Sequence, residues 1–213
     1  MFQTDGVSTD YMVRRDDCYG LESIVMVNPA NGSRTKFPQR DYNPPISWDD
    51  RLSNAIGGCC ILHLDGTHYE NAINAARIAK EHGVLVSLDG CSMQKDNEKN
   101  KTLATMADIL IMNSKYPLKV SGKATYDEAL LEMSTWGIKK VVGCTLGDKG
   151  SKFVVGGRVV DFPSFKAKSV VDTTGCGDVF HGAFLSAYVS GMALEKCIRF
   201  ASATACCKCA VPG

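Results

Sequence analysis

At residues 172–178 the sequence is Asp172-Thr173-Thr174-Gly175-Cys176-Gly177-Asp178, and the rest of the chain is organised around this stretch. A short run that can be extended precedes it, and apolar residues recur at helical spacing after it. The stretch therefore predicts a glycine-rich turn that enters a helix. Glycine removes the Cβ atoms that would block a ligand. A helix start offers N–H groups and the positive end of the helix dipole, which together favour an anion.

Asp178 lies at the edge of this predicted anion site. A carboxylate is a poor ligand for phosphate because like charges repel. It can instead act as the base that accepts a proton from a hydroxyl group attacking the phosphate. The simpler interpretation is a tight turn in which Asp178 only caps the helix. The turn by itself leaves both interpretations open.

Composition narrows the class of protein. The chain has 213 residues, enough for one α/β domain, with 45% hydrophobic and 22% charged residues. Its net charge of +1 gives no electrostatic case for binding nucleic acid or a membrane surface. No apolar run is long enough to span a bilayer, and the first residues do not resemble a signal peptide. We therefore expect a cytoplasmic protein with neither of those partners.

The ten cysteines include a Cys-x-x-Cys formed by Cys206 and Cys209, and the neighbours Cys59 and Cys60. No second such pair completes a zinc site. Most of the cysteines lie in apolar stretches, where cysteine behaves as a small hydrophobic residue. We expect reduced thiols in the core rather than disulfides or metal ligands.

Residues 6–45 are predicted to form a β-rich segment and a linker. The candidate strands are 10–14, 23–27 and 33–37, with a turn at 28–32 between the second and the third. Such hairpins bury little by themselves. The segment is therefore expected to pack on another part of the protein or to project as a flap.

Residues 46–213 have a different pattern, in which strands alternate with helices. Strands are predicted at 59–64, 84–88, 107–112 and 140–144, helices at 70–82, 125–136, 178–189 and 194–209, and a hairpin at 152–161. Gly83 suits the end of the first helix, and Thr125 with Glu128 matches a capping box at the start of the second. This alternation predicts an α/β core with a mostly parallel sheet and helices on both faces. Ligands of such a sheet bind beyond the carboxyl ends of its strands. Five predicted strand ends therefore meet at one rim and carry polar residues or glycines there, at 63–66, 89–90, 113, 145–150 and 172–178, the last of them after the extended run 167–171.

The motif Asp-Thr-x-Gly-x-Gly-Asp, followed by a small apolar helix, resembles the C-terminal signature of the ribokinase-like (PfkB) family of sugar and nucleoside kinases. The resemblance implies a three-layer α/β/α sandwich with a small β-rich lid. It implies that Asp178 is the catalytic base, in contact with the substrate, and that Gly175, Cys176 and Gly177 form the anion hole. The middle residue is commonly alanine in that family, whereas this chain has Cys176.

The run from Thr145 to Gly150, Thr-Leu-Gly-Asp-Lys-Gly, resembles the loop that lies along the ATP phosphates and ribose in the same family. By this resemblance the nucleotide-binding residues are Asn113, Thr145, Gly147, Gly150 and Ser202. Ser202 corresponds to a position that flanks the adenine. A small residue that packs between helices is an equal alternative for it.

Asp65 falls where ribokinases place an acidic residue against the sugar hydroxyl groups. A carboxylate can accept hydrogen bonds from two vicinal hydroxyls, but an ordinary aspartate of a strand-to-helix loop is an equal alternative. Neighbouring His63 is interpreted as a hydrogen-bonded histidine of the strand. The resemblance also implies Mg²⁺ with the ATP, a monovalent cation such as K⁺ near Asp172 and Thr174, and a homodimer formed through the lid.

The sequence departs from the family pattern in two places. The family usually carries Asn-x-x-Glu after the third strand, with a glutamate that helps to order magnesium, but here Tyr116 follows Asn113 at that spacing. The opening strands of the family, with their substrate-binding aspartate and Gly-Gly-x-x-x-Asn, have no match. We therefore expect the chain to lack the N-terminal part of a family member.

The leading hypothesis is an ATP-dependent kinase that phosphorylates a hydroxyl of a small sugar, as a ribokinase, fructokinase or ketohexokinase does. The alternative is a truncated or non-catalytic member of the same fold that binds a nucleotide or a sugar. A thiol enzyme that uses Cys176 is a third class, because a helix N-terminus can activate a thiol.

Overall fold

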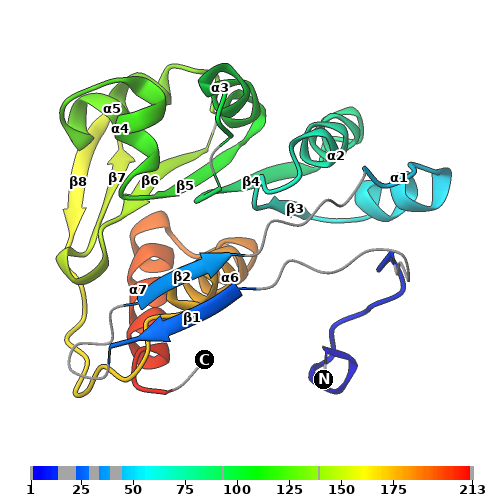
Figure 1. Cartoon of the computed structure of the whole chain (residues 1–213). Coiled ribbons are helices and arrows are strands. Elements are labelled where there is room, and N and C mark those ends of the chain that lie inside the picture. The colour runs from blue at the N-terminus through cyan, green and yellow to red at the C-terminus, as the bar shows by residue number, and fades with distance from the viewer. Residues whose placement is uncertain are drawn as a thin grey trace.

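The computed structural model describes residues 2–13, 23–28, 34–38, 45–92, 94–138 and 140–211. Its centre is a six-stranded sheet in the order β3-β4-β5-β6-β7-β8 (Figure 1). The strands are β3 (Ile61–Leu64), β4 (Leu85–Gly90), β5 (Ile109–Asn113), β6 (Val141–Thr145), β7 (Ser151–Val155) and β8 (Arg158–Phe162). Strands β3 to β6 are parallel, whereas β7 is antiparallel to both β6 and β8. The predicted mostly parallel sheet is confirmed.

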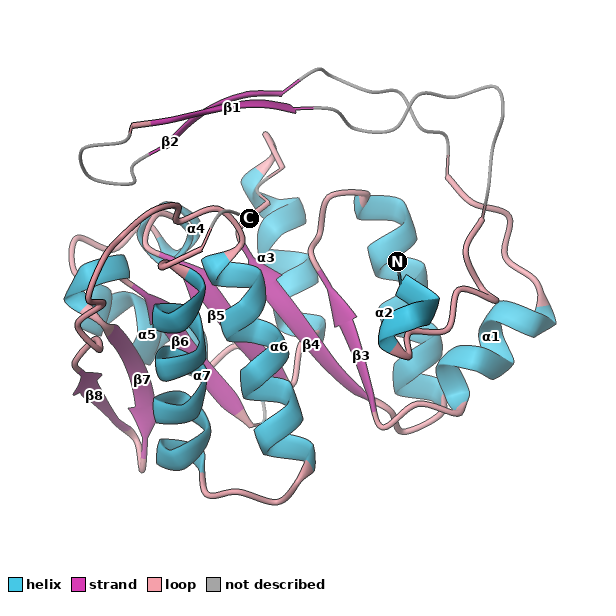
Figure 2. Ribbon diagram, turned by 90° about the horizontal axis from the view of Figure 1, so that it is seen from below, coloured by secondary structure: helices cyan, strands magenta, loops and turns pink. Residues whose placement is uncertain are grey.

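Helices cover both faces of the sheet, as predicted (Figure 2). One face carries α2 (Tyr69–Glu81), α3 (Asn97–Met106), α4 (Tyr116–Ser121) and α5 (Tyr126–Ser134). The other face carries α6 (Cys176–Val189) and α7 (Leu194–Lys208), and α1 (Asp50–Gly57) packs beside α2. The arrangement is a three-layer α/β/α sandwich.

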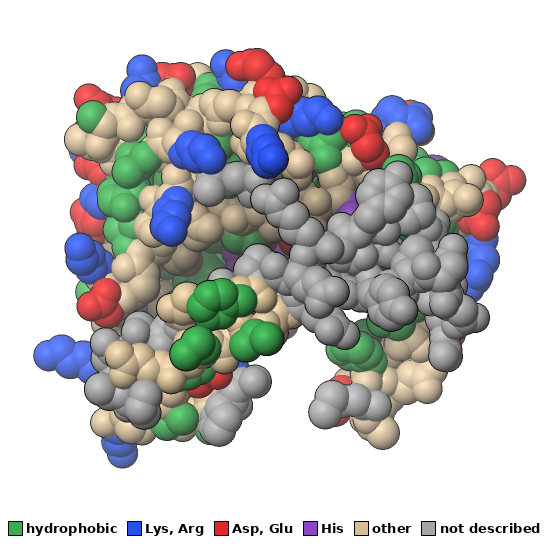
Figure 3. Space-filling model, in the orientation of Figure 1, with side chains coloured by type: hydrophobic (Ala, Val, Ile, Leu, Met, Phe, Trp, Pro, Cys, Tyr) green, Lys and Arg blue, Asp and Glu red, His purple; other side chains and the backbone are tan. Residues whose placement is uncertain are grey.

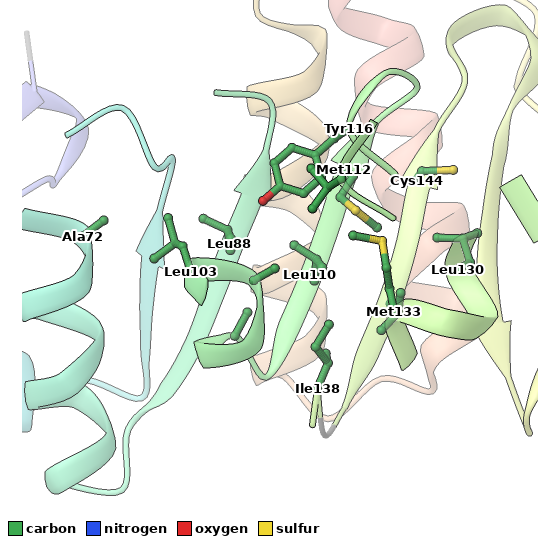
Figure 4. Packing of buried hydrophobic residues seen from close by; sticks show 14 residues of the cluster. Ala72, Leu88, Leu103, Leu110, Met112, Tyr116, Leu130, Met133, Ile138 and Cys144 are labelled. Atoms are coloured by element: carbon green, nitrogen blue, oxygen red, sulfur yellow. The ribbon is translucent and has the colours of Figure 1, made fainter. Parts of the chain in front are cut away.

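The two layers are built from alternate residues of the central strands, because successive side chains of a strand point to opposite faces. In β5, Leu110 and Met112 pack in the cluster that includes Met133 of α5 (Figure 4). Ile109 and Ile111 pack on the other face with the phenylalanines of α6. Burying each such side chain contributes about 1.5–3 kcal/mol. The continuous apolar run of β5 therefore contributes side chains to the hydrophobic core on each face of the sheet.

Helix boundaries follow local signals in the sequence. Thr125 caps α5: its Oγ1 accepts a hydrogen bond from the Glu128 amide, and the Glu128 carboxylate accepts one from the Thr125 amide. Gly83, just after α2, has a φ of 71°, which suits a glycine at the end of a helix. Both signals were expected from the sequence.

Parts of the prediction are wrong or incomplete. Residues 10–13 contain no strand, and the segment 163–175 before the glycine turn contains neither strand nor helix. The turn therefore does not follow a sheet strand. Helices α1, α3 and α4 were not predicted. The first half of α3 is polar, and its start is marked mainly by Asp96, which accepts a hydrogen bond from the Glu98 amide.

The cysteines are also less buried than expected. Within the described residues Cys144 and Cys197 are buried, whereas Cys59, Cys60, Cys91 and Cys207 are exposed. The exposed Cys59 and Cys60 immediately precede β3, and the exposed Cys207 lies near the end of α7. The described part of the chain contains no helix with both the length and the hydropathy needed to cross a membrane.

Strands β1 (Ser23–Val27) and β2 (Arg34–Pro38) form a separate antiparallel hairpin. Figure 2 shows it lying across the end of the molecule at which α6 begins. Ile24 pairs with Phe37, and both are exposed, at 72% and 53%, as is Met26 at 61%. These side chains form an apolar patch on the hairpin (Figure 3). Most of the predicted linker lies outside the described residues, and the division into a lid (6–45) and a core (46–213) stays a prediction.

Candidate active site

The glycine turn is held in place by the end of α7. The carbonyl oxygen of Cys209 accepts hydrogen bonds from the amides of Val171, at 2.7 Å, and Asp172, at 3.3 Å. Asp172 is buried, and its Oδ1 accepts a hydrogen bond of 2.8 Å from the Thr174 amide. Gly175 then adopts a φ of 76° and precedes the first residue of α6. This left-handed conformation requires glycine in practice, so the turn is a defined connection into the helix.

Asp178 lies in the first turn of α6, and its carboxylate faces back toward the glycine turn. A Cβ atom on Gly175 would lie 3.8 Å from Oδ2 of Asp178 and 3.9 Å from Cε of Lys208. The amides of Gly177 and Asp178 have no carbonyl one turn earlier in the helix, whereas the Cys176 amide donates to the Thr173 carbonyl at 3.4 Å. The Asp178 carboxylate and the Lys208 side chain therefore both lie beside Gly175 at the N-terminus of α6, and the Lys208 ammonium donates to the Val211 carbonyl at 3.3 Å.

Asp65 follows β3 on a strand-end loop. Its carboxylate accepts hydrogen bonds from the amide and the hydroxyl of Thr67, at 2.9 and 2.8 Å. This is the ordinary role of an aspartate in a loop, and it leaves further lone pairs on the same carboxylate for a ligand. Asp65 and Asp178 both act electrostatically to raise the pKa of His63. Both predicted substrate-contacting carboxylates therefore act on the same histidine.

A pair formed by His181 and Asp89 lies beneath these carboxylates. His181, three residues after Asp178 on α6, is buried, and its Nε2 is 3.3 Å from Oδ1 of Asp89 at the end of β4. The His181 ring lies 5.3 Å from the ring of His63, whose Nδ1 is 3.1 Å from the hydroxyl of Ser87. Burial first, and then His181, lower the pKa of His63 despite the three nearby carboxylates. The hydrogen bond to Ser87 agrees with the interpretation of His63 as a strand histidine.

We expect Asp89→Ala to destabilise the protein by about 1–3 kcal/mol, because it leaves the buried Nε2 of His181 without its partner. Asp89→Asn keeps an acceptor oxygen and should cost less. The matched control is Asp161→Ala, which removes an ion pair to Lys152 whose aspartate is 73% exposed; it should cost less than about 1 kcal/mol. Urea unfolding measures all three. Equal losses in the two alanine variants would contradict a structural role for the Asp89–His181 pair.

Four of the five predicted nucleotide residues, all except Ser202, lie at the ends of β5 and β6 or in the loop that follows β6. Asn113 pairs with Thr145 in the register of these strands, so the two lie side by side. The side-chain oxygen of Asn113 accepts hydrogen bonds from the amides of Lys115 and Tyr116. Gly147 and Gly150 have φ values of 65° and 91°, and the Gly150 carbonyl accepts a hydrogen bond of 2.7 Å from the Leu146 amide. The loop 145–150 is therefore a tight turn at the strand ends.

A model of the pfkB family of carbohydrate kinases matches residues 1–213. The chain belongs to this family. It is 35% identical to a ribokinase of Arabidopsis thaliana over 192 residues, which cover 87% of this chain and 48% of that protein. It is 26% identical to a sugar kinase of Archaeoglobus fulgidus, covering 93% of this chain and 79% of that protein. The chain thus spans about half the length of the plant relative.

Solved structures agree with this assignment. The structure of Arabidopsis thaliana ribokinase in complex with ribose and ATP superposes with a TM-score of 0.81 and 30% identity, over 98% of this chain and 69% of that one. The three-layer fold predicted from the sequence is thus the fold of a ribokinase.

One departure of this pfkB-family chain from the usual pattern has a structural explanation. Tyr116, which stands where a glutamate is usual, is buried in the core, and its hydroxyl donates to the Asn100 carbonyl at 3.1 Å. Burial raises the pKa of Tyr116 well above its usual value. Tyr116 therefore packs α4 against the core. Its side chain cannot replace the carboxylate that a glutamate would provide at the ends of the strands.

Sequence reasoning missed three residues that lie near Asp178 or the glycine turn in this pfkB-family chain: His181, Lys208 and Cys209. The spacing of His181 from Asp178 places both on one side of α6 and was the available signal. Lys208 and Cys209 reach the glycine turn only because α7 ends beside it, and no local pattern indicates that. Ser202 lies on α7, partly buried, and its contact with adenine stays a prediction.

Proposed function

We propose that this chain carries the phosphoryl-transfer centre of an ATP-dependent sugar kinase. One observation carries the proposal: the Asp178 carboxylate lies beside Gly175 at the N-terminus of α6, so a base and an anion site adjoin. A base that accepts the proton of an attacking hydroxyl needs this proximity to the phosphoryl group. The relatives support the proposal, because the Arabidopsis thaliana ribokinase structure contains ribose and ATP.

In this mechanism a sugar hydroxyl attacks the γ-phosphate in line while the Asp178 carboxylate accepts its proton. The backbone at Gly175, Cys176 and Gly177 stabilises the charge on the transferring phosphoryl group, as helix N-termini do for anions. Lys208 adds a positive charge beside the same turn. Nothing covalent is required of the protein, since phosphoryl transfer depends mainly on positioning and electrostatics.

The nucleotide is proposed to lie along the loop 145–150. Thr145, Gly147 and Gly150 would face its phosphates and ribose, with Asn113 alongside and Ser202 near the adenine. Support comes from the register that places Asn113 beside Thr145, and from Gly147, where no atom lies within 4 Å of an added Cβ, so a ligand can approach the backbone closely.

The residues near the turn fit a monovalent cation such as K⁺. Oγ1 of Thr174 is buried and has no hydrogen-bond partner within the described residues, and Asp172 supplies a buried carboxylate two residues away. For magnesium, no three His, Cys, Asp or Glu side chains in the described ranges are placed to hold a metal ion together. This fits Mg²⁺ bound mainly through nucleotide phosphates and water, where it neutralises phosphate charge.

Asp65 is proposed to bind the sugar hydroxyl groups. Asp65→Ala should therefore lower kcat/KM for the sugar by about tenfold or more, equivalent to the loss of one charged hydrogen bond of roughly 1.5–3 kcal/mol. KM for ATP should stay the same. Thr67→Val, which removes one partner of this carboxylate, separates loop structure from substrate binding. An equal rise in the sugar KM in both variants would show that Asp65 acts only through the loop.

The test of the proposed function is coupled ADP release with Mg²⁺-ATP across ribose, fructose, other ketohexoses, 2-keto-3-deoxygluconate and nucleosides. Turnover with one of them supports a kinase and names its substrate class. ATP binding without turnover on any of them favours the alternative, a non-catalytic binding member of the family. The buried Tyr116 in place of the usual glutamate is the observation that favours this alternative.

Besides the sugar, we propose a second copy of this chain as a partner, bound through the hairpin as a homodimer. The apolar patch of Ile24, Met26 and Phe37 supports it, since exposed patches of this kind often mark interfaces. Sedimentation equilibrium of the chain and of an Ile24→Asp variant tests it: a monomer in both would contradict the dimer. A cytoplasmic location remains a prediction from the sequence.

A further inference from the structure

Two thiols from distant parts of the sequence meet at the proposed anion site. Cys176 is the first residue of α6, and Cys209 follows the last residue of α7. Their sulfur atoms are 3.3 Å apart, which is contact distance for two thiols and longer than the roughly 2.05 Å of a disulfide bond. Both residues are partly exposed, so a small solute can reach them.

The backbone around the pair is already fixed. The Cys209 carbonyl holds the amides of Val171 and Asp172, and so ties the end of α7 to the strand-free segment before α6. Cys176 stands between the two glycines of the turn, and its amide contacts the Thr173 carbonyl. Closing the remaining gap between the sulfurs needs a side-chain shift of roughly 1 Å rather than a rearrangement of the helices.

We propose that Cys176 and Cys209 are an oxidation site, at which a peroxide converts the thiol pair into a disulfide that disables the anion hole. This inference rests on the proposed function for its effect on activity. One sulfur attacks a peroxide oxygen, the O–O bond breaks, and a sulfenic acid and one water form. The second sulfur then attacks the sulfenic sulfur, the S–S bond forms, the S–O bond breaks, and a second water leaves with the thiol proton.

The disulfide acts on catalysis through position. It joins the first residue of α6 to the residue after α7, so the amides around Gly175 and Gly177 lose the freedom to adjust to the phosphoryl group. Misplacing such groups by about 1 Å can cost a factor of about 10² in rate. The bond adds no bulk beyond the two existing sulfurs, so thiol reduction should restore activity fully.

The cross-link can be mapped without measuring activity. Trypsin cleaves after Lys168, Lys196 and Lys208, so Cys176 and Cys209 fall in different peptides, each containing a single cysteine. Cys206 and Cys207 fall in a third peptide. After hydrogen peroxide treatment and alkylation, mass spectrometry should find the peptide of Cys176 joined to that of Cys209, and dithiothreitol should separate them.

Two variants connect the cross-link to function. Cys209→Ser keeps the carbonyl that holds the turn but removes the second sulfur, so its ADP release and ATP affinity should resist peroxide. Cys207→Ser removes an exposed neighbouring thiol but keeps the Cys176–Cys209 pair. Peroxide should therefore lower the activity of this variant by about 10²-fold, the same loss as in the unmodified chain. Absence of the cross-link while Cys207 is oxidised would overturn the proposal. So would equal inactivation of the Cys209→Ser variant, or a cross-linked chain with unchanged turnover and ATP affinity.

The same experiment separates this inference from the proposed function. If the reduced chain neither binds ATP nor turns over any sugar, the proposed function fails, and the peptide map alone decides whether the oxidation site exists. If the reduced chain is active, the amount of cross-linked peptide must rise and the activity must fall together as the peroxide concentration increases.

Discussion

Replacing Asp178 by asparagine is expected to lower the rate of phosphoryl transfer by a factor of about 10²–10⁴, which is the range for loss of a general base. Asparagine has the same shape and can still accept a hydrogen bond, but it cannot take a proton. The position of the side chain beside Gly175 should therefore survive. KM for ATP should change little, because the proposed nucleotide contacts lie on the loop 145–150 and the first-turn amides.

Glu195→Gln is the matched control, because Glu195 is the acidic residue in the first turn of α7. Both substitutions remove a negative charge near a helix N-terminus, which costs only about 0.3–1 kcal/mol of stability. If Asp178 merely favours its helix, the two variants should lose similar stability and neither should lose turnover selectively. Thermal unfolding and coupled ADP release distinguish the cases. Undiminished turnover of Asp178→Asn would contradict the assignment of the base.

The sequence predicted the parts of the site that are coded locally. The glycine turn, the capping box at Thr125 and the loop from Thr145 to Gly150 each lie within one stretch of chain, where spacing determines geometry. The positions of Asp65 and Asn113 at carboxyl ends of strands followed from the topology of a parallel sheet, whereas the glycine turn follows no strand. These elements lie where expected in the structure, apart from the missing strand before the turn.

Other features could not be predicted because they depend on tertiary packing. The contact between the sulfur of Cys209 and that of Cys176 exists only because α7 ends beside the start of α6. The pair of His181 and Asp89 joins a helix face to a strand end, and no local pattern indicates that these two residues meet. Tyr116, the first residue of α4, packs in the core cluster that includes Leu88 and Met112. The two cysteines are 33 residues apart, the His181–Asp89 pair joins a helix to a strand, and the Tyr116 hydroxyl bonds a carbonyl 16 residues away on α3.

The largest effect on stability is expected at Gly150. Its φ is 91°, and a Cβ atom there would lie 2.1 Å from the Phe162 carbonyl oxygen and 2.9 Å from the Ser164 amide nitrogen. Both are backbone atoms and cannot swing aside. Gly150→Ala should therefore combine left-handed strain of about 1–2 kcal/mol with an overpacking cost of about 1–3 kcal/mol. At about 2–4 °C per kcal/mol for a chain of this size, Tm should fall by roughly 5–15 °C.

Gly147→Ala is the internal comparison, because its φ of 65° is also left-handed but no atom lies within 4 Å of the new Cβ. It should cost only the strain of about 1–2 kcal/mol. If the loop lies along the ATP phosphates, Gly147→Ala should raise KM for ATP more than its small loss of stability explains, since the methyl group points into the open space a nucleotide would fill. Thermal unfolding and ATP titration of both variants therefore distinguish a glycine needed because the protein leaves no room for a side chain from a glycine needed because the nucleotide approaches it. An unchanged Tm in Gly150→Ala would contradict a structural role for Gly150. An unchanged ATP affinity in Gly147→Ala would contradict a role for Gly147 in contacting the nucleotide.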